Sequence, residues 1–143
     1  MNIKIIANIT KLNTASDGAI KEYGKRLSRY CKFHFYPCKK EKDALKHLSS
    51  STTIFIVTPS KETLSSEELA KKLETLGLTG KSDLGFLIGF SEEFLNSFVD
   101  AYENTIERIT LSSLQLSTSL TAAVLSEQIY RGYRILRKEP YHK

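Results

Sequence analysis

Short apolar runs alternate along the chain with longer stretches in which apolar residues recur every three or four positions. The first run contains Ile3, Ile5 and Ile6, and β-branched residues favour a strand there. On the same pattern, further strands are predicted at 33–36, 53–57, 84–88 and 106–111. Pro59 follows the third run and Gly89 follows the fourth, and both residues are typical of strand ends.

Helical spacing occupies the intervals between these runs. Helices are predicted from Thr14 to Tyr30, over about 41–48, from Ser65 to Leu76, over about 92–104 and over about 119–136. Thr14 with Asp17, and Ser65 with Glu68, have the spacing of a capping box at a helix start. Gly77 stands where a glycine just past a helix end is expected.

The alternation of strands with helices predicts an α/β fold. Strands that are apolar throughout are typical of a mostly parallel sheet with helices on both faces. A chain of 143 residues is long enough for one domain with a hydrophobic core and too short for two. We therefore expect residues 1–143 to form a single α/β domain.

Composition excludes several classes of protein. With 41% hydrophobic and 26% charged residues, the chain has the balance of a globular protein. No apolar run reaches the ~20 residues that cross a bilayer, and the N-terminal segment lacks the apolar region of a secretion signal. Two cysteines, Cys31 and Cys38, fit free thiols in a reducing compartment. We therefore expect a cytoplasmic protein.

The common chemical motifs are absent from the sequence. Cys31, His34 and Cys38 suggest zinc, but on a strand Cys31 and His34 point to opposite faces and a fourth ligand is missing, so no metal site is predicted. Neither a phosphate-binding glycine loop nor a serine nucleophile elbow is present. The hydroxylated residues of 110–121 are typical of turns and caps, or of a compact loop whose backbone binds a ligand.

The net charge of +5, from 21 basic and 16 acidic residues, permits a polyanionic partner without requiring one. Basic residues gather in the first predicted helix and in 127–143, whereas 92–107 is acidic. The last helix is amphipathic. Its polar stripe contains Glu127, Arg131, Arg134 and Lys138, and its apolar stripe contains Leu125, Ile129, Gly132 or Tyr133, and Leu136. We expect the apolar stripe to be available to a partner subunit.

The C-terminal tail combines an aromatic residue, a histidine and a cation in Tyr141, His142 and Lys143. Proteins use aromatic and cationic side chains together to stack on RNA bases and to pair with phosphates. Short aromatic tails also dock onto partner subunits, and the residues alone leave both interpretations open.

Several segments resemble one family. The run SEQIYRGYRI at 126–135 and the terminus PYHK are similar to the C-terminus of the ribosomal RNA large subunit methyltransferase H family, in the SPOUT superfamily of trefoil-knotted methyltransferases. LSSE at 64–67, FLIG at 86–89 and KIIA at 4–7 fall where that family has its equivalents. The resemblance covers essentially the whole chain and is most specific in the last eighteen residues.

This resemblance implies a C-terminal trefoil knot, S-adenosylmethionine as methyl donor, and N3 of a pseudouridine in large-subunit (23S) ribosomal RNA as acceptor. It also implies a homodimer in which the partner's C-terminal tail completes each site. The implied cofactor-binding residues are Val57, Gly89, Leu111, Ser112, Ser113, Leu114, Gln115 and Leu116. The implied catalytic and RNA-binding residues are Arg131, Tyr141, His142 and Lys143.

By residue chemistry, Arg131 suits stabilisation of a uracil-type anion, and His142 suits acceptance of its proton. The sequence departs from the family pattern beside the implied cofactor site. Phe90 replaces a second glycine, Ser117-Thr118 replace Pro-His, and Ala122 replaces an arginine. The alternative function is therefore a knotted dimer that binds RNA without transferring a methyl group.

Overall fold

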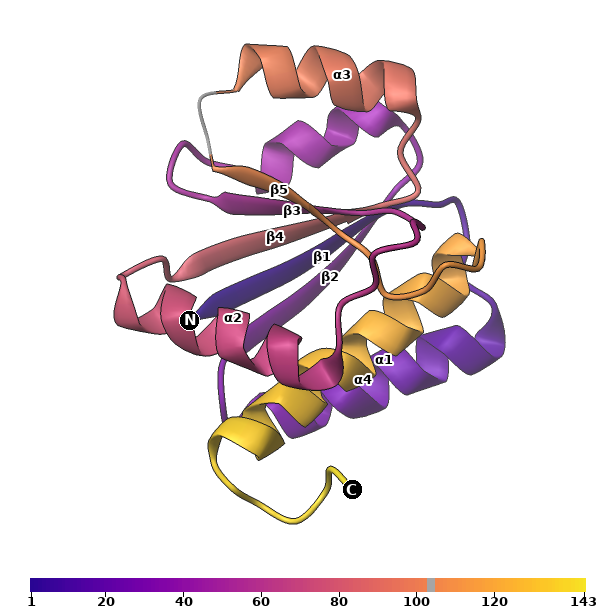
Figure 1. Ribbon diagram of the computed structural model, residues 1–143. Helices are drawn as coiled ribbons and strands as arrows, with labels where there is room; N and C mark the ends of the chain where they lie inside the picture. Colours follow the sequence, from indigo (N-terminus) through magenta and orange to yellow (C-terminus); the bar gives the residue numbers. More distant parts are fainter. Residues whose placement is uncertain (103–104) are drawn as a thin grey trace.

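The strands form one parallel sheet in the order β2-β1-β4-β3-β5 (Figure 1). The computed structural model describes residues 1–102 and 105–143. Within these ranges the strands are β1 (Asn2–Asn8), β2 (Lys32–Cys38), β3 (Thr53–Val57), β4 (Asp83–Ile88) and β5 (Ile106–Ile109). Each predicted strand is confirmed, although the fifth ends at Ile109 rather than at 111. The register places Val57 beside both Ile88 and Ile109, so three strands end at one edge.

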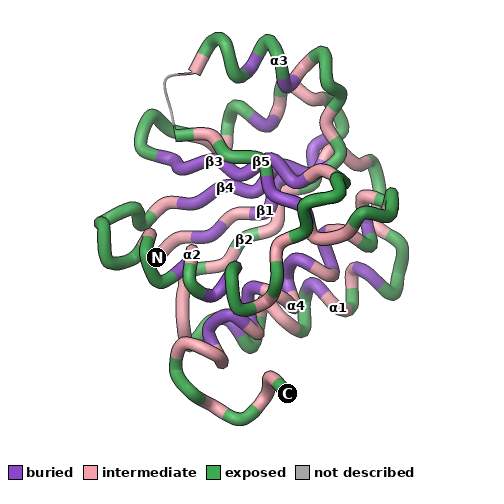
Figure 2. Tube along the Cα trace, in the orientation of Figure 1, coloured by how far each residue is buried: buried purple, intermediate pink, exposed green. Residues whose placement is uncertain are grey.

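Helices cover both faces of the sheet. α1 (Thr14–Leu27), α2 (Ser66–Leu78) and α4 (Thr118–Leu136) lie on one face, and the 3₁₀ helix η1 (Glu41–His47) and α3 (Glu92–Ala101) lie on the other (Figure 1). Successive strand residues enter opposite cores: Ile5 packs in the core beneath α1, α2 and α4, whereas Ile6 packs in the core beneath η1 and α3. Figure 2 shows the buried residues along the sheet and the inner faces of the helices. This confirms the predicted α/β architecture.

Two helix starts test the predicted capping boxes. At α2 the box is confirmed, because Ser65 Oγ accepts a hydrogen bond from the Glu68 amide and Glu68 Oε1 accepts one from the Ser65 amide. At α1 the prediction for Thr14 is wrong. The N-cap is Asn13, whose Oδ1 accepts a hydrogen bond from the Ser16 amide at 2.8 Å. Asparagine caps a helix at least as well as threonine, so the cap lies one residue earlier.

Three predicted helix ends are also wrong. α1 ends at Leu27 rather than at Tyr30. α2 continues through Gly77 to Leu78, and Gly80 adopts the left-handed conformation instead, with a φ of 78°. α3 ends at Ala101 rather than at 104, and residues 103–104 of that prediction lie outside the described residues.

α4 reaches its position through a crossing of chain segments. After β5, residues 110–117 run past the carboxyl ends of β3 and β4 (Figure 1). The Leu64 amide donates to the Thr110 carbonyl at 2.7 Å, which ties this segment to the loop after β3. At its other end, Thr118 lies against Gly89 in the turn after β4. This crossing is consistent with the C-terminal knot that the family resemblance implies.

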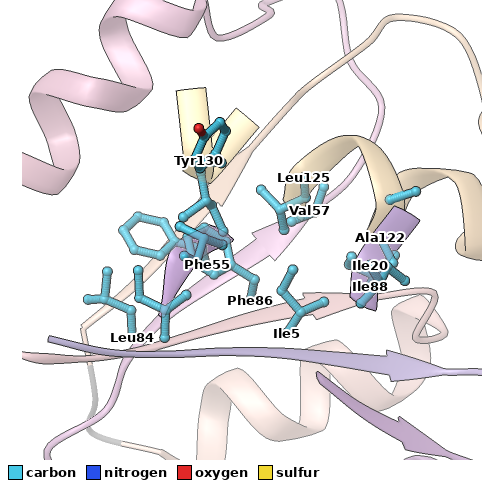
Figure 3. Packing of buried hydrophobic residues seen from close by; sticks show 14 of the residues in the cluster. Ile5, Ile20, Phe55, Val57, Leu84, Phe86, Ile88, Ala122, Leu125 and Tyr130 are labelled. Atoms are coloured by element: carbon cyan, nitrogen blue, oxygen red, sulfur yellow. The ribbon is translucent and has the colours of Figure 1, made fainter. Parts of the chain in front are cut away.

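The apolar stripe of α4 is buried within the chain. Leu125 and Ile129 are fully buried and Tyr133 is nearly so, in the core that α4 forms with α1, α2 and the sheet. Figure 3 shows Leu125 and Tyr130 packed over Phe55 and Val57 of β3. The expectation that this stripe is available to a partner is therefore wrong, because the sheet beneath it already covers it. Within the described residues, every helix falls short of the length or apolar content that a membrane crossing requires.

Candidate cofactor and substrate site

A cavity lies at the carboxyl ends of β3 and β4, beside the chain crossing. We call it the knot cavity. Its empty space is about 400 Å³ including the part open to solvent. Three segments line it: Val57, Thr58 and Pro59; Ile88 and Gly89; and Leu111, Ser112, Leu114, Gln115, Leu116, Thr118 and Thr121. Ligands commonly bind at the carboxyl edge of parallel strands, because the loops there converge.

The residues implied as cofactor contacts all line the knot cavity except Ser113. The sequence reasoning missed Thr58, Pro59 and Ile88, which adjoin implied residues and could have been found by extending each loop by one or two positions. It also missed Thr118 and Thr121. These two residues belong to the first turns of α4, and only the chain crossing brings them to the cavity.

Gly89 is required by the geometry of the knot cavity. Its φ of 82° is in the left-handed region, and a Cβ built there would lie 2.6 Å from Thr118 Oγ1 and 3.3 Å from the Asn8 carbonyl oxygen. Any side chain at this position would collide with the start of α4. The glycine thus lets the turn after β4 and the N-terminus of α4 approach each other.

The lining fits S-adenosylmethionine in its chemistry. Side chains such as Ile88 and Leu116 give the cavity apolar surface, and the compact loop 111–116 offers backbone groups to a ligand. Ser112 Oγ accepts a hydrogen bond from the Leu114 amide at 3.0 Å, which stabilises the shape of that loop. The three segments thus combine apolar side chains with backbone polar groups around one cavity.

Two of the departures from the family pattern, Phe90 and Ala122, lie outside the lining of the knot cavity, whereas a third, Thr118, is part of it. Phe90 packs on Phe94, with ring centroids 5.3 Å apart, in the core on the far face of the sheet. Its side chain is not part of the cavity lining. Ala122 is fully buried in the core beneath α4. Neither residue fills the space between the three lining segments.

The catalytic candidates form a second group around Glu127 of α4. Glu127 Oε1 accepts hydrogen bonds from Arg131 Nε at 3.0 Å and Nη2 at 2.7 Å, and from the Tyr141 hydroxyl at 3.0 Å. The Arg131 guanidinium lies 4.8 Å from the centroid of the Tyr141 ring. Burial, together with hydrogen bonds to Tyr23 and Glu127, raises the pKa of the Tyr141 hydroxyl, which therefore stays protonated.

His142 connects this group to the start of α2. Its Nδ1 lies 3.2 Å from Arg131 Nη1, and its Nε2 lies 2.5 Å from Glu67 Oε1. The pKa of the Glu67 carboxyl is lowered, first by a backbone hydrogen bond at Glu67 and second by the hydrogen bond with His142. The fourth candidate, Lys143, is exposed at the chain end.

Within one chain, the cofactor candidates at the knot cavity and the catalytic candidates around Glu127 lie near each other but form separate sites. The tail folds back along α4 to the level of Glu127, whereas the α4 residues that line the knot cavity are Thr118 and Thr121. Thr121 and Glu127 are six positions apart, which is about 9 Å along a helix axis. The structure thus assembles the cofactor candidates in one place and the catalytic candidates in another.

Comparisons with known proteins agree with these features. A family model described as "Predicted SPOUT methyltransferase" matches residues 1–142. The chain is 38% identical over 143 residues to ribosomal RNA large subunit methyltransferase H 1 of Thermoanaerobacter sp. (strain X514), with all of both chains covered. It is 32% identical over 162 aligned positions to the methyltransferase H of Clostridium kluyveri, again with all of both chains covered.

A third relative is the methyltransferase H of Enterococcus faecalis, which is 35% identical over 143 positions and covers 87% of this chain and 88% of its own. The family match therefore spans the sheet, the chain crossing, α4 and all but the last residue of the tail. On this full-length similarity, and with the knotted crossing and its cavity in place, the chain belongs to the SPOUT methyltransferase family.

Proposed function

We propose that this chain is an S-adenosylmethionine-dependent methyltransferase that acts on N3 of a pseudouridine in 23S ribosomal RNA, in the cytoplasm. The observation that carries the proposal is the meeting of three separate segments, each implied as a cofactor contact, in the knot cavity. The names of the relatives, methyltransferases of large-subunit ribosomal RNA, support the choice of substrate.

The reaction is an in-line displacement, so the protein must align donor with acceptor and remove the acceptor proton. S-adenosylmethionine supplies an electrophilic methyl group on a sulfonium. Val57, Gly89 and the loop 111–116 would hold it in the knot cavity. Arg131 would stabilise negative charge on the uracil ring, and His142 would accept the N3 proton.

We propose further that the active form is a homodimer in which each knot cavity receives the partner's tail. Two features support this. The tail of one chain stops short of its own knot cavity, and large apolar side chains are exposed beside that cavity. Leu114 in the cavity lining is 71% exposed, and Leu120 in the first turn of α4 is 45% exposed. Exposed apolar side chains next to a ligand site are typical of subunit contacts.

Calorimetric titration with S-adenosylmethionine tests the enzyme against its alternative. If the chain is an active methyltransferase, S-adenosylmethionine should bind saturably at micromolar concentration. The alternative, an RNA-binding knotted dimer, predicts that the cofactor gives no heat while ribosomes still bind. A methylation assay on ribosomes that lack this methyl group then tests the acceptor. Binding of the cofactor without transfer to 23S ribosomal RNA would contradict the proposed substrate.

A further inference from the structure

Three aromatic rings are stacked on the outermost strand of the sheet, β2, which lies beside β1 (Figure 1). The ring centroids of His34 and Tyr36 are 5.8 Å apart, with 16° between the ring planes. Those of Tyr36 and His47, in η1, are 3.8 Å apart, with 10° between the planes. We call these three rings the ring stack. His34 is exposed, and the other two rings are partly exposed, so the stack is accessible from solvent.

Lysine side chains surround the ring stack. Lys4 of β1 is the register partner of His34, and Lys4 and Lys46 line a cavity beside the stack. Its empty space is about 420 Å³ including the part open to solvent. Lys32 is exposed and lies two residues before His34, on the same face of β2. Rings and cations thus share one surface, which we call the β2 patch and which consists of Lys4, Lys32, His34, Tyr36, Lys46 and His47.

The β2 patch lies in the most basic part of the chain outside the C-terminal segment. Residues 32–47 contain five lysines against Glu41 and Asp43, a net charge of +3 in a chain of +5. Glu41 is turned toward the start of α3, where it accepts two hydrogen bonds from Ser91. Asp43 lies 3.5 Å from Lys46, but the Lys46 side chain is 74% exposed. Lys46 can therefore still pair with an anion from solvent.

The neighbouring charges keep the ring stack neutral in a positive surrounding. Lys4 Nζ lies 3.3 Å from Asp83 Oδ1, so the charge of Lys4 is already partly compensated. Burial first, and then the charges of Lys4 and Lys46, lower the pKa of the His47 ring, although Asp43 acts in the opposite direction. The His47 ring is therefore neutral near pH 7, and the lysines supply the positive charge.

We propose that the β2 patch binds ribosomal RNA away from the acceptor nucleotide, with an unpaired base stacked on the His34 ring and phosphates paired with Lys32 and Lys46. This rests on the proposed function. Aromatic rings stack on any base, and an ammonium group pairs with phosphate as a compact charge. A segment of an acidic protein would match the charge, but it does not require flat rings.

The β2 patch and the knot cavity contact different parts of such a substrate. Lys4 pairs with Asp83, the first residue of β4, whereas Ile88, the last residue of that strand, lines the knot cavity. The patch also lies on the η1 face of the sheet, and α4 and the tail lie on the other face. The chain would therefore hold the RNA at a point remote from the site of methyl transfer.

Fluorescence anisotropy with a labelled, unstructured RNA oligonucleotide tests this surface without methylation. His34→Ala should weaken binding at least fivefold, because the stacking of a base is lost, and His34→Phe should restore it. The double variant Lys32→Ala, Lys46→Ala should reduce the slope of log affinity against log salt by about 1.4, since each phosphate contact with a single strand contributes about 0.7. Lys71→Ala, at an exposed lysine of α2, is the matched control and should bind as the wild type does.

Methylation of ribosomes provides the second measurement. Both His34→Ala and the double lysine variant should raise the ribosome concentration at half-maximal rate at least fivefold. The rate at saturating ribosomes and the affinity for S-adenosylmethionine should not change, because the β2 patch contains none of the cofactor or catalytic candidates.

The other outcomes contradict the inference. Equal RNA affinity in the wild type and the patch variants would overturn it. So would polyglutamate of equal charge that binds as tightly as RNA and loses as much affinity in His34→Ala, because the partner would then be an acidic protein. Failure of His34→Phe to restore binding would exclude stacking. If one variant fails to fold, the other decides, since ring and lysines are changed separately. Oligonucleotide binding as expected, without methylation of ribosomes by the wild type, would contradict the proposed function instead.

Discussion

Arg131 and Arg26 make the same local contact in different surroundings. Each pairs with a glutamate four residues earlier on its helix, Glu127 and Glu22 respectively. The side chain of Arg131 is 26% exposed and that of Arg26 is 45% exposed. Only Arg131 also contacts a tail residue, His142. A guanidinium can make these contacts at once because its donors lie in a fixed plane, whereas an ammonium is a single compact charge.

We expect Arg131→Lys to lose at least about tenfold in single-turnover methylation, which is ~1.4 kcal/mol at the transition state. The charge is retained, but the planar set of donors to Glu127 and His142 is lost. S-adenosylmethionine affinity should be unchanged, because Arg131 is not in the lining of the knot cavity. The matched control Arg26→Lys should methylate at the wild-type rate. Equal losses of methylation rate in both variants would show that Arg131 acts only as one of several basic surface residues.

The raised pKa of the Cys31 thiol predicts that the protein becomes less stable at alkaline pH. Burial raises the pKa of this thiol to about 11. An unfolded chain releases this proton near pH 8.5. Between pH 8.5 and 11 the folded state therefore binds more protons, and stability falls as pH rises. We expect wild-type protein to lose stability more steeply than Cys31→Ala over this range, by at most ~1.4 kcal/mol per pH unit. Urea titrations at three pH values measure the difference; parallel curves would contradict it.

At the scale of elements, the turn after β4 and the start of α4 are fitted to each other through Gly89. We expect Gly89→Ala to destabilise the protein by roughly 1–3 kcal/mol through backbone strain alone, with a further cost from the clash with Thr118. Cofactor affinity should fall at least tenfold. Gly18 provides the contrast, because a Cβ there would meet nothing within 4 Å on the exposed side of α1. Gly18→Ala should stabilise the chain by up to ~1 kcal/mol. Calorimetric unfolding of the two variants compares them directly.

The tail is an element of its own, which packs on α4 and α1 rather than in the core. Tyr141 contacts the Tyr130 ring edge-on at 4.9 Å, and its hydroxyl lies 3.4 Å from that of Tyr23. Deletion of residues 141–143 should abolish methylation, lower the melting temperature only slightly and preserve cofactor affinity. Methylation of ribosomes at the normal rate by the truncated chain would show that the catalytic candidates are wrong.

At the scale of the whole molecule, the separation of the tail from its own knot cavity predicts complementation between chains. Light scattering should give twice the mass of one chain. A Gly89→Ala chain and a chain without 141–143 should each be inactive, whereas a mixed dimer combines an intact knot cavity with an intact tail from its partner. We expect co-expression of the two to restore methylation. A mixture that dimerises but stays inactive would mean that the tail serves its own chain.

The secondary-structure elements and their order follow from the sequence. Its apolar periodicity identified each strand and the amphipathic last helix, because burial on a sheet or on a helix face imposes periods of two or 3.6 residues. The residues of the C-terminal segment also identified the family. Local competition was harder to predict: Asn13 displaced Thr14 as the cap of α1, and Gly80 displaced Gly77 at the end of α2. At both sites two nearby residues have similar propensities to cap a helix, so apolar periodicity cannot tell which of them does so.

Which residues meet depends on how the fold packs these elements together. The chain crossing brings Thr118 against Gly89 and places Leu111 in the lining of the knot cavity, and no short-range pattern encodes a contact between segments so far apart. The tertiary structure also decided that the apolar stripe of α4 faces the chain's own sheet rather than a partner, since amphipathicity specifies a buried face but not what buries it. A series of contacts from Ser66 through Gln128 to His142 joins α2, α4 and the tail, and it exists only because the fold packs these three segments together.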